Sequence, residues 1–221
     1  DWKSQIAYTT PNFSGFQATA GLTQAWDSQV LHTGDQGSQG RAGAGFAYEG
    51  KASYSFAAND VTGKVWVSAL AQKFTGVTHA SGADNTDTVA YAGDIGANVN
   101  LANFGLTGYY YSGQGIGQTI QFLGAFDSKG AMRDSEGGYV QATYTLPTKT
   151  KIGLSWGESN IDKTNANDTM SDLKDSMWTA GVYHPLTKHL NLVAEYSNVE
   201  SEQGTAKSRA HTGALGAILF F

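Results

Sequence analysis

The sequence predicts an all-β protein, a transmembrane antiparallel β-barrel, and three observations support this prediction. Apolar and polar residues alternate over many short stretches, which is typical of strands with one apolar face. Short turns alternate with long polar loops along the chain. The chain ends on an apolar, strand-like segment, residues 213–221, whose last residue is aromatic. Because a barrel pairs its last strand with its first, such a terminus is expected to be structured.

The composition excludes the main alternatives to β structure. With 28 glycines, 11 tyrosines and 5 tryptophans in 221 residues, the chain is too rich in turn-forming and aromatic residues for a helical or a disordered protein. No run approaches the roughly 20 consecutive apolar residues of a membrane helix. The mean hydropathy of -0.31 suits a barrel, because only alternate residues of its strands face lipid.

Turn signals divide the chain into about eleven strands. In order, they are predicted at residues 3–10, 16–26, 41 or later to 57, 61–74, 86–101, 105–112, 138–146, 151–159, 176–184, 190–199 and 210–221. Short turns are predicted at 11–15, 58–60, 102–104, 147–150 and 185–189, and long polar loops at 27–40, 75–85, 113–137, 160–175 and 200–209. This sorting of connections favours a transmembrane barrel over a soluble sandwich.

The alternation defines two faces on the predicted strands. In residues 151–157, Ile152, Leu154 and Trp156 alternate with Lys151 and Ser155, so one face suits lipid and the other water. A soluble sandwich would show the same stripes packed into a core, so alternation alone leaves both architectures open. Aromatic residues near strand ends resemble an interfacial girdle: Tyr8, Phe13, Phe16, Phe104, Tyr144, Tyr183, Phe220 and Phe221.

Six polar residues are predicted to line a water-filled lumen: Asp94, Asn98, Gln141, Lys151, Asn191 and Glu195. Fixed charge on a pore wall biases ion selectivity through the local potential. The alternative for each residue is an ordinary wall position without special effect, because pores respond to rings and patches of charge.

Charge and cysteine content exclude several function classes. A net charge of -5 gives no basic face for neutralising phosphates, so nucleic acid is not an expected partner. The sequence has 0 cysteines, which excludes disulfides and cysteine-based metal sites. We expect no bound metal and no cofactor.

Catalytic motifs are absent from the sequence, so we predict that the protein is not an enzyme. It has no Gly-x-Ser-x-Gly elbow at a strand-to-helix turn, no His-Glu-x-x-His pattern and no P-loop. The glycine run in residues 113–117 is similar to a dinucleotide loop, but no βαβ pattern surrounds it, and a flexible loop is the preferred interpretation. Four aspartates of one long loop, Asp162, Asp168, Asp172 and Asp175, could hold divalent cations, and a solvated charged loop is the simpler alternative.

Three segments carry a resemblance to the general porins of Gram-negative bacteria. Residues 6–16 resemble a strand, Pro-Asn-Phe turn and strand of that family, and residues 183–196 resemble the hairpin before its penultimate strand. Gly216, Leu219 and Phe221 resemble its C-terminal outer-membrane assembly signal. Many porins carry a histidine near the position of Leu219, and this chain does not.

The resemblance implies a 16-stranded porin-type barrel, of which residues 1–221 form a single domain without the N-terminal strands and the constriction loop. It implies an outer-membrane protein that lets small hydrophilic solutes and ions diffuse passively, contacts lipid and lipopolysaccharide, and forms a homotrimer. The alternatives are a substrate-selective channel, and a barrel enzyme or adhesin that acts through its loops.

Overall fold

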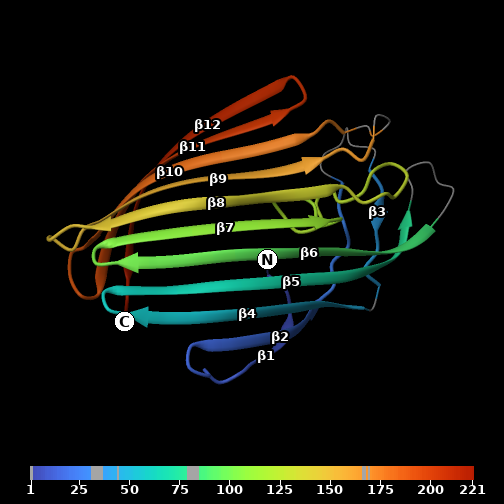
Figure 1. Ribbon diagram of the computed structural model, residues 1–221. Helices are drawn as coiled ribbons and strands as arrows, with labels where there is room; N and C mark the ends of the chain where they lie inside the picture. The colour runs from blue at the N-terminus through green and yellow to red at the C-terminus, as the bar shows by residue number, and fades with distance from the viewer. Residues whose placement is uncertain (1, 31–36, 44, 79–84, 166–167, 169) are drawn as a thin grey trace.

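The computed structural model describes residues 2–30, 37–43, 45–78, 85–165, 168 and 170–221, which form one antiparallel sheet (Figure 1). Its strands are β1 (Gln5–Thr9), β2 (Phe16–Gln24), β3 (Gln39–Gly40), β4 (Phe46–Ala58), β5 (Val61–Thr78), β6 (Asn85–Leu101), β7 (Phe104–Gln114), β8 (Asp134–Thr145), β9 (Lys151–Asp162), β10 (Leu173–Pro185), β11 (Leu190–Gln203) and β12 (Ala206–Leu219). Within these residues, no helix is long and apolar enough to cross a membrane.

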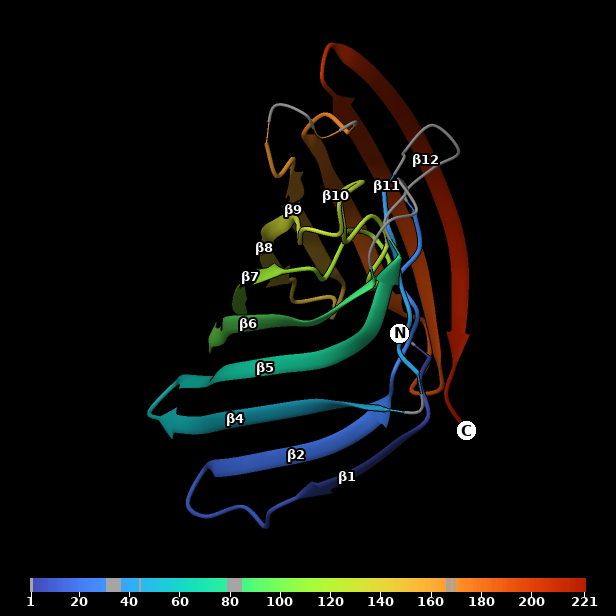
Figure 2. The same ribbon diagram turned by 90° about the vertical axis from the view of Figure 1, so that its right-hand side faces the viewer.

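The predicted fold class is confirmed, because strands that follow one another in the sequence, apart from β3, pair with one another in an all-β antiparallel sheet. The eleven predicted strands correspond to β1, β2 and β4 through β12. The extra strand, β3, lies in a predicted loop and pairs with β5. In the part of the chain described, β1 pairs only with β2 and β12 only with β11, so the curved sheet is not closed (Figure 2).

Several strands extend further toward the long-loop end than predicted. β8 begins at Asp134 rather than residue 138, and β10 begins at Leu173 rather than residue 176. The charged residues in these stretches are typical of loops, but each pairs in register with the neighbouring strand. A local pattern cannot detect such pairing, because the partner lies elsewhere in the sequence.

The prediction of a long loop at residues 200–209 is wrong. Residues 204–205 alone connect β11 to β12, and Gly204 has the positive φ, +58°, that the first position of a type II′ hairpin turn requires. The charged residues there form cross-strand ion pairs: Glu200 Oε2 lies 2.7 Å from Arg209 Nε, and Glu202 Oε1 lies 2.6 Å from Lys207 Nζ. These pairs explain why a polar stretch forms strand rather than loop.

The register gives the sheet a polar and an apolar face. One row of paired residues across seven strands is polar throughout: Asn98, Thr107, Gln141, Ser155, Thr179, Ser197 and Thr212. The residues beside this row face the other way, and Leu106, Val140 and Leu154 are each more than half exposed. This is the division of faces that the alternation predicts.

On the apolar face, the residues of one register row change from apolar to charged along the sheet. It runs through Val67, Ile95, Tyr110, Gly138, Glu158, Ser176, Glu200 and Arg209, from β5 to β12. Its first members are apolar or aromatic, whereas Glu158 forms an ion pair with Lys174 at 2.5 Å and Glu200 one with Arg209.

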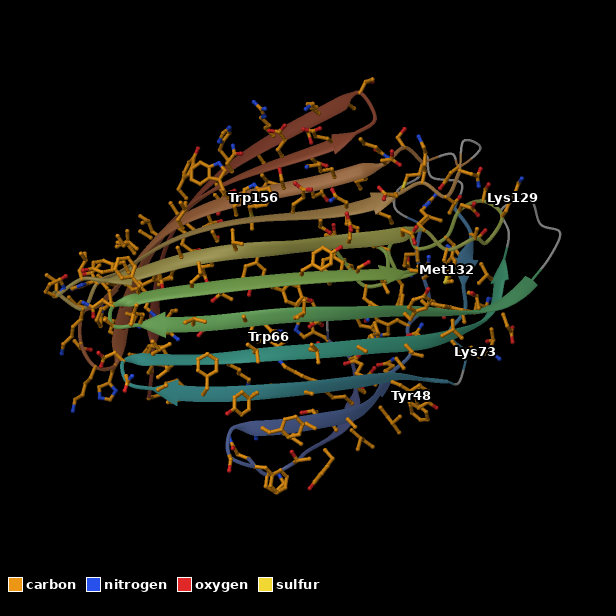
Figure 3. The ribbon with its side chains drawn as sticks, viewed as in Figure 1. Tyr48, Trp66, Lys73, Lys129, Met132 and Trp156 are labelled. Atoms are coloured by element: carbon orange, nitrogen blue, oxygen red, sulfur yellow. The ribbon has the colours of Figure 1, made fainter. Side chains whose placement is uncertain are left out.

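The apolar core lies at the long-loop end, where residues 115–133 fold into the hollow of the sheet (Figure 2). Phe122 and Phe126 of this segment are buried against Phe74 of β5. Both rings meet Phe74 edge to face, with centroids 5.1 Å (Phe122) and 5.2 Å (Phe126) from that of Phe74. Met132 of the same segment also lies at this end, whereas Trp66 lies near the middle of β5 (Figure 3). The segment therefore occupies part of the space on the concave side of the sheet.

Candidate pore wall and inward segment

All six predicted lumen residues lie on one face of the sheet. Asn98 and Gln141 belong to the polar register row, and Asp94 lies four residues from Asn98 on β6, hence on the same face. By the same spacing, Lys151 shares the face of Ser155, and Asn191 and Glu195 share that of Ser197, which are both members of the row. That this face borders a water-filled lumen stays a prediction.

These six residues do not form one cluster. Asp94 accepts a hydrogen bond from Ser68, and Asn98 Nδ2 donates one to Thr107 Oγ1 at 2.8 Å. Nearer the short-turn end, Tyr183 pairs in register with Lys151, and its hydroxyl donates to Glu195.

The inward segment, residues 115–133, starts at the glycine run that was similar to a dinucleotide loop. Gly113 lies within β7, which ends at Gln114, and Gly115 and Gly117 have φ angles of +69° and +71°. A Cβ on Gly117 would lie 2.2 Å from the carbonyl oxygen of Leu123, so only glycine fits this turn. No helix follows the run among the described residues, so the strand–turn–helix context of a dinucleotide loop is not present there. The run reverses the chain toward the hollow of the sheet.

A buried ion pair fixes the end of the inward segment. Arg133 Nε lies 2.8 Å from Asp168 Oδ2, Arg133 Nη2 lies 2.6 Å from Asp168 Oδ1, and both side chains are fully buried. Arg133 Nη1 also donates to the carbonyl of Gly124 at 3.0 Å. Burial opposes ionisation of Asp168, but Arg133 and the backbone N–H groups of Met170 and Thr164 outweigh it, so the pKa of Asp168 lies below its usual 3.8.

Sequence reasoning missed this pair and the inward fold of the segment. The pair joins two loops 35 positions apart, and no local motif marks it. A signal is nevertheless present in the sequence. Residues 113–137 are too apolar for the predicted long polar loop, because they include Ile116, Ile120, Phe122, Leu123 and Phe126.

The aspartate-rich loop does not assemble a cation site among its described residues. Asp168 is engaged by Arg133, and Asp172 Oδ1 accepts the backbone N–H of Lys163 at 2.9 Å. No group of three or more metal-ligating side chains occurs in the described part of the chain. The solvated-loop interpretation holds for Asp172, whose side chain is exposed, but not for Asp168, which is buried. Asp162 and Asp175 lie in β9 and β10 rather than in the loop.

A recess lies between the inward segment and the sheet, and we call it the loop recess. Its volume is about 590 Å³, and its lining includes Glu49, Lys51, Asp94, Tyr109, Tyr111 and Gln121. Lys3 also lines it, with Nζ 3.9 Å from Glu49 Oε1 and 5.5 and 5.3 Å from the ring centroids of Trp26 and Phe122. Burial lowers the pKa of Lys3, and Glu49 opposes that shift.

The predicted assembly signal lies at the exposed end of the sheet. Gly216 pairs with Val193 and Leu219 with Leu190, and Phe221 follows the end of β12 fully exposed. The role of Gly216, Leu219 and Phe221 in assembly stays a prediction.

The aromatic side chains near the short turns are mostly exposed. The rings of Phe104 and Tyr144 lie 4.6 Å apart on the apolar face, and Tyr8 and Phe16 are exposed there too. Tyr183 differs from the girdle prediction, because it lies on the polar face and binds Glu195.

Comparisons with known proteins agree with this architecture. A family model described as Gram-negative porin matches residues 1–204. No curated protein matches the sequence. Among solved structures, the chain is similar to the outer membrane channel DcaP of Acinetobacter baumannii, with a TM-score of 0.72 and 15% identity over 98% of this chain and 62% of that one.

Two further structures show the same fold. An anion-selective porin from Comamonas acidovorans has a TM-score of 0.58 and 19% identity over 96% of this chain and 55% of that one. The trimer form of OmpT, an outer membrane protein of Vibrio cholerae, has a TM-score of 0.57 and 11% identity over 98% of this chain and 64% of that one. The chain thus spans less than two thirds of each of these three proteins.

Proposed function

The chain belongs to the Gram-negative porin family, and from this premise we propose that the whole protein is a passive diffusion channel for small hydrophilic solutes and ions. Membership of the family makes it a multi-pass β-barrel protein of the outer membrane. A channel also fits a chain that lacks catalytic motifs better than an enzyme does.

One observation carries the proposal: the sheet separates a continuous polar face from an apolar face along a fixed register. The polar row from Asn98 to Thr212 crosses seven strands without an apolar member. The opposite face exposes Leu106, Val140 and Leu154, as a wall in contact with lipid would. Such a wall gives water and ions a polar path through an apolar slab.

Charges on the polar face would set the ion preference of the channel. Asp94 and Glu195 are acidic, Lys151 is basic, and the three amide residues Asn98, Gln141 and Asn191 are neutral. The inward segment would restrict the size of permeating solutes, because it occupies part of the hollow of the sheet. We further propose that the protein contacts lipid and lipopolysaccharide and assembles as a homotrimer.

The test is single-channel conductance of the intact native protein in a planar bilayer under a salt gradient. Large current steps in groups of three would support a trimeric diffusion channel, and the reversal potential would give its ion preference. A correctly folded, heat-modifiable protein that stays silent would refute the channel. A substrate-selective channel, the second candidate, would show saturable block of the current by its solute.

A further inference from the structure

We propose that the loop recess is a binding subsite for the ring of a neutral sugar. This inference rests on the proposed channel function and gives it a solute class. It is carried by three features of the recess: aromatic rings that lie along its wall, a carboxylate oxygen without a partner, and balanced charge.

The aromatic surface of the recess is built by rings that lie flat on the sheet. The ring centroids of Tyr109 and Tyr111 lie 6.3 Å apart, with an angle of 35° between the ring planes. Tyr139 continues the surface, with its ring centroid 5.7 Å from that of Tyr109 and an angle of 33° between the planes. A Cβ on Gly137 would lie 2.7 Å from Cε1 of Tyr111, so the ring covers this glycine instead of projecting from the wall. Flat rings present their negative faces, against which the weakly positive C–H groups of a sugar ring can pack.

The same arrangement recurs on the next strands of the sheet. A Cβ on Gly96 would lie 2.1 Å from Cζ2 of Trp66, and Gly96 pairs in register with both Trp66 and Tyr109. Tyrosine and tryptophan faces therefore continue from β5 to β8 on the polar side of the sheet. An aromatic stripe among polar rows is the usual lining of a site for a small molecule with apolar faces and polar edges.

The polar edge of a sugar finds both a donor and an acceptor in the recess. Asp94 accepts from Ser68 with one oxygen, and its Oδ1 is buried with no hydrogen bond among the described residues. Lys51 Nζ lies 5.4 Å from the Trp66 ring centroid, and Lys51 forms no ion pair with any residue that the structure describes. Hydroxyl groups both donate and accept, and hydrogen bonds to charged groups are the stronger kind.

The spacing and net charge of these groups favour a neutral ring. Lys51, Ser68 and Asp94 are consecutive partners in one register row, which places the two charged residues two strands apart, about 10 Å at the backbone. Lys3 and Lys51 balance Glu49 and Asp94. Because these four charges cancel, the recess as a whole favours a neutral solute over an anion or a cation. Its volume of about 590 Å³ suits a small cyclic solute.

The experiment measures block of the ion current by glucose in the intact protein. Sorbitol is the matched control, since it carries similar hydroxyl groups without a ring, and alanine tests a zwitterion. We expect glucose to reduce the current saturably and sorbitol to do so much less. Asp94→Asn and Tyr109→Leu should each raise the half-blocking concentration of glucose about tenfold.

Two control variants separate the recess from the rest of the barrel. Asp175→Asn removes a carboxylate from the register row of Asp94, four strands away, and Tyr110→Leu changes the adjacent residue on the apolar face. Both should leave the block by glucose unchanged. A conducting channel that responds equally to glucose and sorbitol, or to alanine alone, overturns the sugar subsite. So does a channel in which the recess variants behave as the controls do. A folded protein without conductance overturns the proposed channel itself.

Discussion

Replacing Arg133 by methionine is expected to release the inward segment while the strands stay paired. Methionine keeps much of the volume of the side chain but removes both bonds to Asp168 and the bond to the Gly124 carbonyl. Breaking a buried ion pair by removing one partner costs about 3–5 kcal/mol, because the other charge is left buried without compensation.

This cost is comparable with the apolar contribution that holds the segment in place. Phe122 and Phe126 are buried, and each contributes roughly 1.5–3 kcal/mol relative to exposure, or roughly 3–6 kcal/mol together. A loss of about 3 kcal/mol corresponds to an increase of about a hundredfold in the population of the opened segment.

Amide hydrogen exchange measures that population directly. The N–H groups of Phe122, Gly124 and Arg133 are hydrogen-bonded within or against the segment and should exchange about a hundredfold faster in the variant, whereas amides of β9 and β10 should not change. The double variant Arg133→Met with Asp168→Asn should recover part of the protection, because it removes the stranded charge. Unchanged protection of Phe122 and Gly124 in Arg133→Met would refute the reasoning.

Acid should act on the same contact. The folded-state pKa of Asp168 lies below its unfolded value, so the pair stabilises the segment fully above the unfolded value of about 3.9 and loses this contribution as the pH falls through the folded pKa. In Asp168→Asn this acid-dependent step in exchange should be absent. Acid release of equal size in both proteins would assign the step to another group.

Three further predictions concern the two faces and the glycine turn. Leu154→Arg should destabilise the barrel by about 2–4 kcal/mol near the bilayer midplane, while Ser155→Arg, on the other face, should be tolerated; equal yields of heat-modifiable barrel for both would contradict the face assignment. Gly117→Ala should speed hydrogen exchange in the inward segment, because its Cβ meets the Leu123 carbonyl, and unchanged exchange would speak against this turn. Glu195→Gln should shift the reversal potential toward anion preference, and an unchanged potential would remove Glu195 from the selectivity-determining residues.

The strands could be predicted because their signal is local. Alternation with period two and glycine or proline at the turns mark each strand without knowledge of its partner. The residues at which the strands begin and end on the long-loop side could not be predicted in the same way. Glu200 and Arg209 are polar enough for a loop, and only their pairing across the hairpin shows that they continue β11 and β12.

The candidate site was predictable only in part, for the same reason. The face shared by Asp94, Gln141 and Glu195 follows from alternation, and the register agrees with it. The contact of Arg133 with Asp168 joins two separate loops and has no local pattern. The flat packing of Trp66 over Gly96 likewise depends on strand register, which a single sequence does not reveal.

The part of the register row that runs from Val67 to Arg209 indicates how the strands are inclined to the bilayer. In a barrel whose strands tilt by about 40°, such a row changes depth by roughly 3 Å per strand, hence by roughly 20 Å from β5 to β12. This is close to the height of an apolar band of about 25 Å. Val67 and Ile95 suit the hydrocarbon core, whereas Glu200 and Arg209 do not. The position of the row must therefore shift toward the long-loop end of the barrel from β5 to β12. We therefore expect the hairpin of β11 and β12 to lie at the depth of the lipid headgroups. The order of side chains along one row thus indicates the direction of strand tilt.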